Sequence, residues 1–489
     1  MKRTAVINVV GLSESLLGAH TPRINAFRAA GALSRITPAF PAVTCTAQSN
    51  YLTGQTPAQH GIVGNGWYHR ELAEVQFWKQ SNHLVAGKKI WETLREVDPK
   101  FTCAKMFWWY NMYSTANWSI TPRPMYPADG RKFFDIYAWP YSIREEIKKD
   151  LGEFPFPAFW GPAAGVDSSR FAADAVSRWI AESAKWIERK CAPTLNLIYL
   201  PHLDYNLQRF GPCVEGRAGS PLPAVGAHGV TRPTNPIIAD DLRRIDAIVG
   251  DLIDFFARQS VQVVLLSEYG ISAVDTPVHL NRLFRERGWL TIKEELGLEL
   301  LDCGASRVFA VADHQVAHVY LNDLSLEREV RALLEKQPGI DAVWGEAEKQ
   351  THGLNHSHAG DLIAVAKDNA WFTYYYWQED NRAPDFARTV DIHRKPGYDP
   401  VELFLDPQIP LAKARIAWRL LQKKLGFRML MDVVPLDASL VKGSHGRRPK
   451  NSQEWPLLIS SRPHLLPEGV INSTEVFQIL RHHLTEVSL

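Results

Sequence analysis

The distribution of apolar residues along the chain predicts strands and helices in alternation. Residues 3–10 form a short β-branched apolar run closed by a glycine, which is the pattern of a buried strand. Similar runs lie at 194–200 and 261–267, and helical patterns occupy 168–189 and 236–258. This order predicts an α/β fold with a mainly parallel sheet sandwiched by helices. In such folds functional groups gather beyond the carboxyl ends of the strands.

Two stretches interrupt the alternation within what we expect to be a single domain over residues 1–489. Residues 105–165 are rich in aromatics and prolines and are predicted to form a smaller insert. Within it, Trp108, Trp109 and Tyr110 are candidates for stacking on a substrate base or sugar, although such a cluster is as often part of a core. Residues 211–236 hold many glycines and prolines and are predicted to form a lid loop, with a plain surface loop as the alternative.

Composition and charge narrow the class of protein. The chain has 489 residues, 45% hydrophobic and 22% charged, which is typical of a globular protein. Its net charge is 55 − 53 = +2, so bulk electrostatics give no case for nucleic-acid binding. Five widely spaced cysteines without a CxxC pair, together with the lack of a signal-peptide pattern or membrane-spanning run, predict a cytoplasmic protein. A basic helical stretch at 412–428 fits a solvated face or, less commonly, a membrane surface.

Thr44 is the first candidate for chemistry. It lies at a predicted loop-to-helix junction, where free backbone N–H groups favour anionic groups. A hydroxyl becomes a nucleophile only with help from a base or a bound metal ion. An isolated threonine at such a junction is usually a helix cap, so the neighbouring residues have to decide between the two roles.

The segment around Thr44 resembles the nucleophile segment of the alkaline phosphatase superfamily, in its type I phosphodiesterase/nucleotide pyrophosphatase branch. The shared positions are Thr44, Thr53-Gly54, Pro57, His60-Gly61-Ile62 and Asn65. The resemblance implies an alkaline-phosphatase-like fold in which Thr44 attacks phosphorus. It also implies that Asn65 and the backbone N–H of Cys45 bind phosphoryl oxygens.

Later segments at 199–212, 265–271 and 443–446 resemble the metal-binding motifs of the same family. Family members hold two zinc-like ions through six side chains. The resemblance makes Asp204 and His445 metal ligands, and Glu268 replaces an aspartate. The other three ligand positions depart from the pattern, because an aspartate and two histidines are replaced. The replacing residues are Val10, Tyr269 and Gln208.

These departures leave two interpretations. The first is one or two divalent ions, zinc above manganese or magnesium, held with the help of substitute ligands. The candidates for that role are His202, His279, Gln208 and Tyr269, with Glu14 and His20 as replacements for Val10. The second is a ligand-binding relative with a degenerate site, or a phosphomutase-type transferase.

Weaker signals complete the expected site. Residues 391–400 resemble a late family segment that approaches the active site, and the cations His393 and Arg394 could contact a phosphate there. Asp313, His314 and His318 are ordinary packing residues or a further metal group. The resemblance predicts a metal-assisted phosphodiesterase, pyrophosphatase or phosphatase acting on a small nucleotide-like phosphate ester through a phospho- or nucleotidyl-threonine intermediate. It predicts no oligomeric state.

Overall fold

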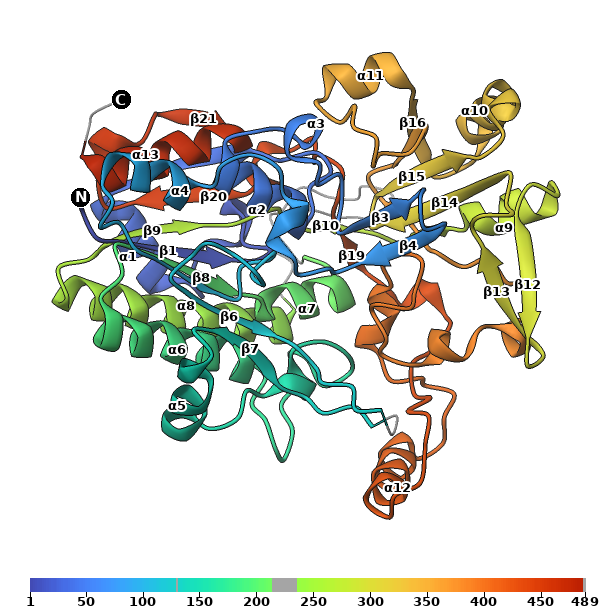
Figure 1. Ribbon diagram of the computed structural model, residues 1–489, viewed down its shortest axis with the longest axis horizontal. Helices are drawn as coiled ribbons and strands as arrows, with labels where there is room; N and C mark the ends of the chain where they lie inside the picture. The colour runs from blue at the N-terminus through green and yellow to red at the C-terminus, as the bar shows by residue number, and fades with distance from the viewer. Residues whose placement is uncertain (129–130, 213–234, 487–489) are drawn as a thin grey trace, which may run out of the picture.

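The computed structural model describes residues 1–128, 131–212 and 235–486. The predicted lid loop at 211–236 falls almost wholly on residues 213–234 and so lies outside the described part of the chain. A nine-stranded sheet forms the centre of the molecule, with five parallel and three antiparallel strand pairs (Figure 1). In spatial order its strands are β21 (Gly469–Asn472), β2 (Ala32–Thr37), β20 (Leu457–Ser460), β9 (Gln262–Leu266), β1 (Thr4–Val9), β8 (Leu195–Leu200), β5 (Cys103–Met106), β6 (Trp118–Pro122) and β7 (Ile136–Trp139).

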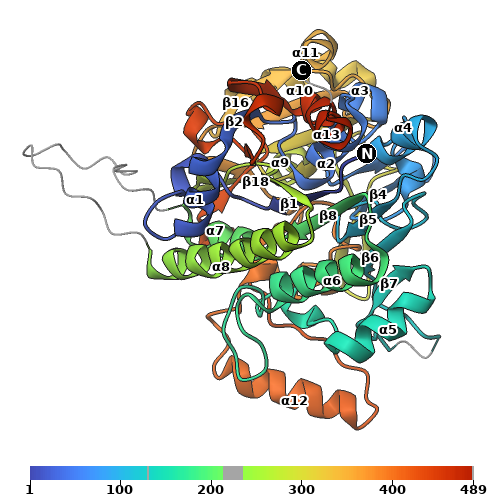
Figure 2. The same ribbon diagram turned by 90° about the vertical axis from the view of Figure 1, so that its left-hand side faces the viewer.

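Helices cover both faces of this sheet, as the alternating pattern predicted (Figures 1 and 2). One face carries α1 (Pro22–Ala30), α6 (Ala175–Cys191), α7 (His202–Phe210) and α8 (Pro236–Arg258). The other carries α2 (Thr44–Thr53), α4 (Ile90–Val97) and α13 (Val476–Thr485). The predicted α/β sandwich with a mainly parallel sheet is therefore confirmed.

The three central strands end at one edge of the sheet because they pair in parallel and in register. Asn8 of β1 lies opposite Leu266 of β9, and Val9 lies opposite Leu200 of β8. The residues that follow these strands are therefore brought together in space. This edge is where the predicted metal motifs meet the start of α2.

A smaller antiparallel sheet, here called the second sheet, lies beside the main sheet. Its order is β14 (Val308–Asp313), β15 (Val316–Leu321), β17 (Leu362–Ala366) and β16 (Ile340–Trp344). Helices α9 (Leu280–Glu286) and α10 (Glu327–Lys336) pack near its strands, and its apolar side chains form their own buried cluster. Residues 105–165, predicted as an insert, extend the main sheet through β6 and β7 and add α5 (Ser142–Leu151).

One helix stands apart from both sheets. α12 (Ala412–Lys424) projects from the lower end of the molecule in both views (Figures 1 and 2). In the described part of the chain, no helix combines the length and the apolar character needed to cross a membrane.

Candidate active site

Thr44 is the first residue of α2 and lies at the carboxyl edge of the main sheet. Its N-cap, Val43, is extended, so the chain turns into the helix at Thr44. The side chain is buried, and its Oγ1 lies 3.4 Å from the phenolic oxygen of Tyr269. The first N–H groups of a helix have no partner within the helix, so this end of α2 presents hydrogen-bond donors beside the hydroxyl.

Asn65 lies next to this helix start and is held by a buried carboxylate. Its Oδ1 accepts a hydrogen bond of 3.1 Å from the backbone N–H of Cys45. Its own N–H and Nδ2 donate to Asp313 of β14 at 2.7 and 3.0 Å. Burial raises the pKa of Asp313 to about 7, although the bonds from Asn65 oppose that shift. The spacing of Thr44 and Asn65 in the sequence therefore corresponds to proximity in space.

Asp204 and Gln208 lie one turn apart on α7, immediately after β8. The Gln208 Nε2 donates to Asp204 Oδ2 at 2.6 Å, and the Tyr269 hydroxyl donates to Asp204 Oδ1 at 3.3 Å. The hydroxyl of Tyr398 donates to Gln208 Oε1 at 2.9 Å. Burial raises the pKa of Asp204 to about 7. Both oxygens of the Asp204 carboxyl thus accept hydrogen bonds from neutral side chains.

Glu268 follows β9 and is also held by side-chain amides. Its Oε1 accepts a hydrogen bond of 2.5 Å from Asn8 of β1 and another from Gln48 of α2. Burial raises the pKa of Glu268 to about 8, while hydrogen bonds from Gln48, Asn8 and Thr44 act in the opposite direction. The carboxyl of Glu268 and the hydroxyl of Thr44 are therefore direct neighbours.

His445 belongs to a stack of four rings at the same edge. Its Nδ1 lies 2.7 Å from the carbonyl of Ala42, so the neutral ring carries its proton there. The ring lies 3.6 Å from that of Tyr269 on one side and 3.6 Å from that of His314 on the other. His314 in turn stacks on Tyr398 at 3.6 Å. Burial lowers the pKa of His445 to about 3, which keeps the ring uncharged.

These side chains do not fit the two-ion site that the family resemblance implies. Among the described residues, no group of three or more His, Cys, Asp and Glu side chains could hold a metal ion. Val10 offers no donor atom, and the amides of Gln48 and Gln208 satisfy the oxygens of Glu268 and Asp204. Four buried atoms of the side chains at this edge have no hydrogen-bond partner within the described chain, namely Asn8 Oδ1, Glu268 Oε2, His314 Nδ1 and His445 Nε2. The amide oxygen of Asn8 is a poor zinc ligand, and a zinc site needs three or four converging protein ligands, which the described side chains do not supply.

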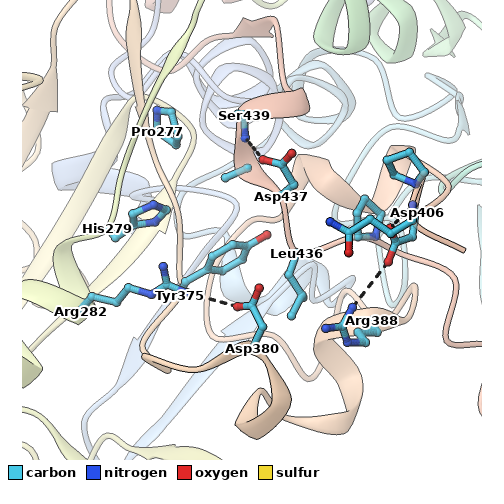
Figure 3. Close-up of a pocket in the computed structure, with 14 residues that line it drawn as sticks. Pro277, His279, Arg282, Tyr375, Asp380, Arg388, Asp406, Leu436, Asp437 and Ser439 are labelled. Carbon is cyan, nitrogen blue, oxygen red and sulfur yellow. Dashed lines mark hydrogen bonds and ion pairs between the residues drawn. The ribbon is translucent and has the colours of Figure 1, made fainter.

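The remaining candidate ligands lie elsewhere. His202 is buried at the start of α7, and burial lowers its pKa to about 4 although Asp174 and Asp241 act in the opposite direction. His279 lies 2.7 Å from the hydroxyl of Thr373 and lines a separate cavity of about 430 Å³ (Figure 3). Glu14 forms ion pairs with Arg28 and Arg35, and His20 lies beside Arg243.

The predicted substrate-binding residues lie in different surroundings. Trp108 is fully buried in the main core, and the N–H of Trp109 donates to Gln48 Oε1 at 2.6 Å. Tyr110 is buried against the Cys45 thiol. His393 and Arg394 are exposed; the first contacts the carbonyl of Phe77 and the second pairs with Asp385 at 3.0 Å. The segment 391–400 does approach the site, but through Tyr398.

Sequence reasoning assigned no role at this site to the individual residues Asn8, Gln48, His314 and Tyr398, although it named His314 as a candidate elsewhere and placed the segment of Tyr398 near the site. Asn8 was the most accessible signal, because it is the only amide in an otherwise apolar strand. Gln48 lies one helical turn after Thr44, on the same side of α2. His314 and Tyr398 come from loops whose position depends on the second sheet. All four are uncharged groups that match no ligand pattern.

The fold and the site together define an enzyme of the phosphodiesterase/phosphatase type on an alkaline-phosphatase-like fold. The chain belongs to the type I phosphodiesterase / nucleotide pyrophosphatase family, whose model matches residues 4–399. No curated protein matches the chain.

Solved structures share the fold at low sequence identity. Murine ectonucleotide pyrophosphatase / phosphodiesterase 5, as an inactive variant in complex with AMP, is similar with a TM-score of 0.56 and 14% identity over 100% of this chain and 96% of that chain. Phosphonoacetate hydrolase from Sinorhizobium meliloti 1021, in complex with phosphonoacetate, gives a TM-score of 0.57 and 14% identity over 97% and 94%. Human ectonucleotide pyrophosphatase / phosphodiesterase 5 gives a TM-score of 0.56 at 14% identity over 100% and 96%.

The buried titratable groups predict a stability maximum near neutral pH. Burial raises the pKa of Asp204, Asp241, Glu268 and Asp313 to about 7 or 8, so these carboxyls hold protons in the folded state that the unfolded state has lost; it also raises the pKa of Glu402, which lies beside Lys395. Stability due to these groups falls as the pH rises from about 4 to about 8. Seven buried histidines have lowered pKa values, so their contribution falls as the pH drops below about 6.5. They are His60, His202, His279, His314, His318, His445 and His483.

Thermal unfolding measured from acidic to alkaline pH is therefore expected to give the highest Tm at about pH 6.5, with a decline on both sides. The alkaline decline should become shallower in Glu268→Gln, because that variant no longer loses a proton there. A Tm that keeps rising between pH 6.5 and pH 8.5 would contradict this assignment of protonation states.

Proposed function

We propose that this enzyme hydrolyses a small phosphate or phosphonate ester through attack of Thr44 on phosphorus. The observation that carries the proposal is the buried Thr44 hydroxyl at the start of α2, in contact with Tyr269 and the Glu268 carboxyl. Family membership supports the reaction class. AMP and phosphonoacetate, bound by two proteins of the same fold, illustrate the size and charge of ligand that we expect.

In the proposed reaction Glu268 accepts the proton of Thr44. The threonine oxygen forms a bond to phosphorus, and the bond between phosphorus and the ester group breaks. For an oxygen ester, the leaving alkoxide takes the proton that Glu268 received from Thr44 and departs as an alcohol, so Glu268 can accept a proton from the attacking water. Water then attacks the phospho-threonine, so that phosphate or a monoester is released and the hydroxyl is restored. A carboxyl whose pKa is raised to about 8 is a stronger base than an ordinary glutamate, which suits this role.

Hydrogen-bond donors and partly protonated carboxyls would reduce the electrostatic repulsion between the site and an anionic substrate, without the help of a fixed cation. Cys45 N–H already donates to Asn65 Oδ1, so the other first-turn N–H groups of α2 and the second proton of Asn65 Nδ2 would supply the hydrogen-bond donors for phosphoryl oxygens. With pKa values raised to about 7, Asp204 and Asp313 are partly protonated at neutral pH. We assign no step to the predicted zinc or other divalent ions, since the ligand set does not fit them. The cytoplasmic location stays a prediction.

Binding of a phosphate ester without turnover is the second candidate function. It is favoured by the replacement of four of the six family ligand positions, at Val10, Glu268, Tyr269 and Gln208. A phosphomutase-type transfer would use the same covalent intermediate but pass the phosphoryl group to a second hydroxyl instead of water.

The test is hydrolysis of bis-(p-nitrophenyl) phosphate and p-nitrophenyl phosphate by metal-analysed protein, before and after chelator treatment. We expect turnover to survive chelation, kcat/KM to rise with pH through about 8 in wild type, and this rise to be absent in Glu268→Gln. Acid-quenched protein should carry a phosphoryl group on the peptide that contains Thr44. Activity that disappears on chelation and returns with zinc would overturn the proposed role of Glu268. Tight ligand binding without turnover or intermediate would favour the second candidate.

A further inference from the structure

α12 has an unusual distribution of charge and exposure. All of its residues are at least partly exposed, and it projects away from both sheets (Figures 1 and 2). Residues 411–431 contain no aspartate or glutamate. The cations in this stretch are Lys413, Arg415, Arg419, Lys423, Lys424 and Arg428.

The apolar side of α12 faces solvent, not the protein. Trp418, Leu421 and Leu425 follow one another at helical spacing and are 58%, 44% and 64% exposed. A side of the helix next to this stripe carries Arg415 and Arg419, which are partly covered and bind the carboxylate of Asp432. An ordinary surface helix turns its apolar stripe inward and its charges outward. The orientation of α12 is reversed, so its apolar stripe lacks a partner within the described part of the chain.

A loop next to α12 also exposes apolar side chains. Lys423 Nζ donates a hydrogen bond of 3.3 Å to the carbonyl of Lys132, so the two segments lie side by side. Around Lys132 the chain exposes large apolar side chains at 42–60% of their surface; these are Met125, Tyr126, Phe133 and Phe134. The ammonium of Lys132 lies 5.7 Å from the ring of Tyr126 and 5.8 Å from that of Phe134. Cations and aromatic rings therefore alternate over both segments.

We propose that α12 and residues 125–134 outside the undescribed pair 129–130 form a docking surface for an anionic lipid membrane, and we call it the α12 surface. Tryptophan, leucine and phenylalanine side chains enter the boundary between headgroups and acyl chains, while flanking lysines and arginines contact anionic headgroups. Exposed Lys413 and Lys424 lie beside the apolar stripe, and exposed Lys423 lies toward Lys132; together they complete this pattern. A second copy of the chain is a poorer occupant, because the two cationic surfaces would repel each other.

The test is sedimentation of the full chain with vesicles of phosphatidylcholine alone or with added phosphatidylglycerol. We expect binding to the anionic vesicles only, and a loss of binding as salt rises. Lys423→Glu with Lys424→Glu should weaken binding at least about thirtyfold, since each cation near the surface adds roughly tenfold or somewhat less. Trp418→Ser with Leu421→Ser should weaken it more than about a hundredfold, because both apolar side chains leave the membrane.

The matched charge control is Arg328→Glu with Lys336→Glu on α10, two exposed cations on a different part of the molecule. This control should bind like wild type. Because α12 is exposed, its variants should keep the wild-type Tm and the wild-type hydrolysis of soluble esters, so the outcome is separate from that of the proposed reaction. Equal binding to neutral and anionic vesicles, or binding unchanged in the α12 variants, would overturn the proposal. A dimer in ultracentrifugation that Trp418→Ser abolishes would instead assign the surface to a second copy.

Discussion

Thr44→Ala is expected to lower the rate of phosphate-ester hydrolysis by about a thousandfold or more, because alanine has no oxygen with which to form the covalent intermediate. Thr44→Ser should keep much of the activity, since it retains the hydroxyl and loses only a methyl group. The measurement is kcat/KM for p-nitrophenyl esters, together with the phosphoryl content of acid-quenched protein. Only the serine variant should carry the phosphoryl group.

Thr46→Ala is the matched control on the same helix. The Thr46 hydroxyl donates to the carbonyl of Ile62 at 3.3 Å, which makes it a buried threonine in a structural role. This variant should lose some stability and keep its rate per folded molecule. Equal activity losses in Thr44→Ala and Thr46→Ala would mean that both act through the folding of α2, and the nucleophile assignment would fail.

The sequence predicted both the main sheet and the proximity of the motifs that follow its strands, and one physical reason explains both. β1, β8 and β9 are apolar runs that pair in parallel, so whatever follows them has to lie at a common edge. Asp204 follows β8 and Glu268 follows β9 in this way. Asp204 is linked to Thr44 through the hydroxyl of Tyr269, whereas the Glu268 carboxyl lies directly beside the Thr44 hydroxyl.

What the sequence could not predict is how these groups satisfy one another. Whether Glu268 meets a cation or an amide depends on the side chains of Asn8 and Gln48, which come from a strand and a helix far apart in the chain. His279 follows Glu268 closely in sequence, yet β11 (Thr276–Val278) pairs with β18 (Ala370–Phe372) in a separate two-stranded sheet, and His279 contacts Thr373 there. Nearness along the chain was a poor guide once the main sheet had ended.

The segment 391–400 illustrates the same limit. It has no helical or strand period, so nothing in its pattern indicates which side chain points inward. His393 and Arg394 were predicted to contact a phosphate because cations bind phosphate, but both face solvent. Tyr398 reaches the site instead. It lies in the chain between the members of a buried charge cluster, Lys395 before it and Asp399 and Glu402 after it.

That cluster gives the second large effect. Lys395 is 1% exposed, and its ammonium lies 2.7 Å from the carboxylates of both Asp399 and Glu402. Lys395→Met is expected to cost about 3–5 kcal/mol of unfolding free energy, since it leaves two buried carboxyls without their cation. Urea unfolding at neutral pH measures the loss. Arg394→Met is the adjacent control: its exposed pair with Asp385 should contribute less than about 1 kcal/mol.

A consequence for the site follows from the same contacts. Tyr398 lies between Lys395 and Asp399, and its hydroxyl holds Gln208, which in turn holds Asp204. Where Lys395→Met still folds, we therefore expect weaker substrate binding with a smaller change in kcat, whereas Tyr398→Phe should reproduce the binding change at nearly full stability. A stable Lys395→Met protein with wild-type kinetics would show that neither the buried cation nor the position of Tyr398 matters. We expect the loss of stability to exceed the loss of binding, because the charge cluster is linked to the region of Thr44 only through this chain of hydrogen bonds.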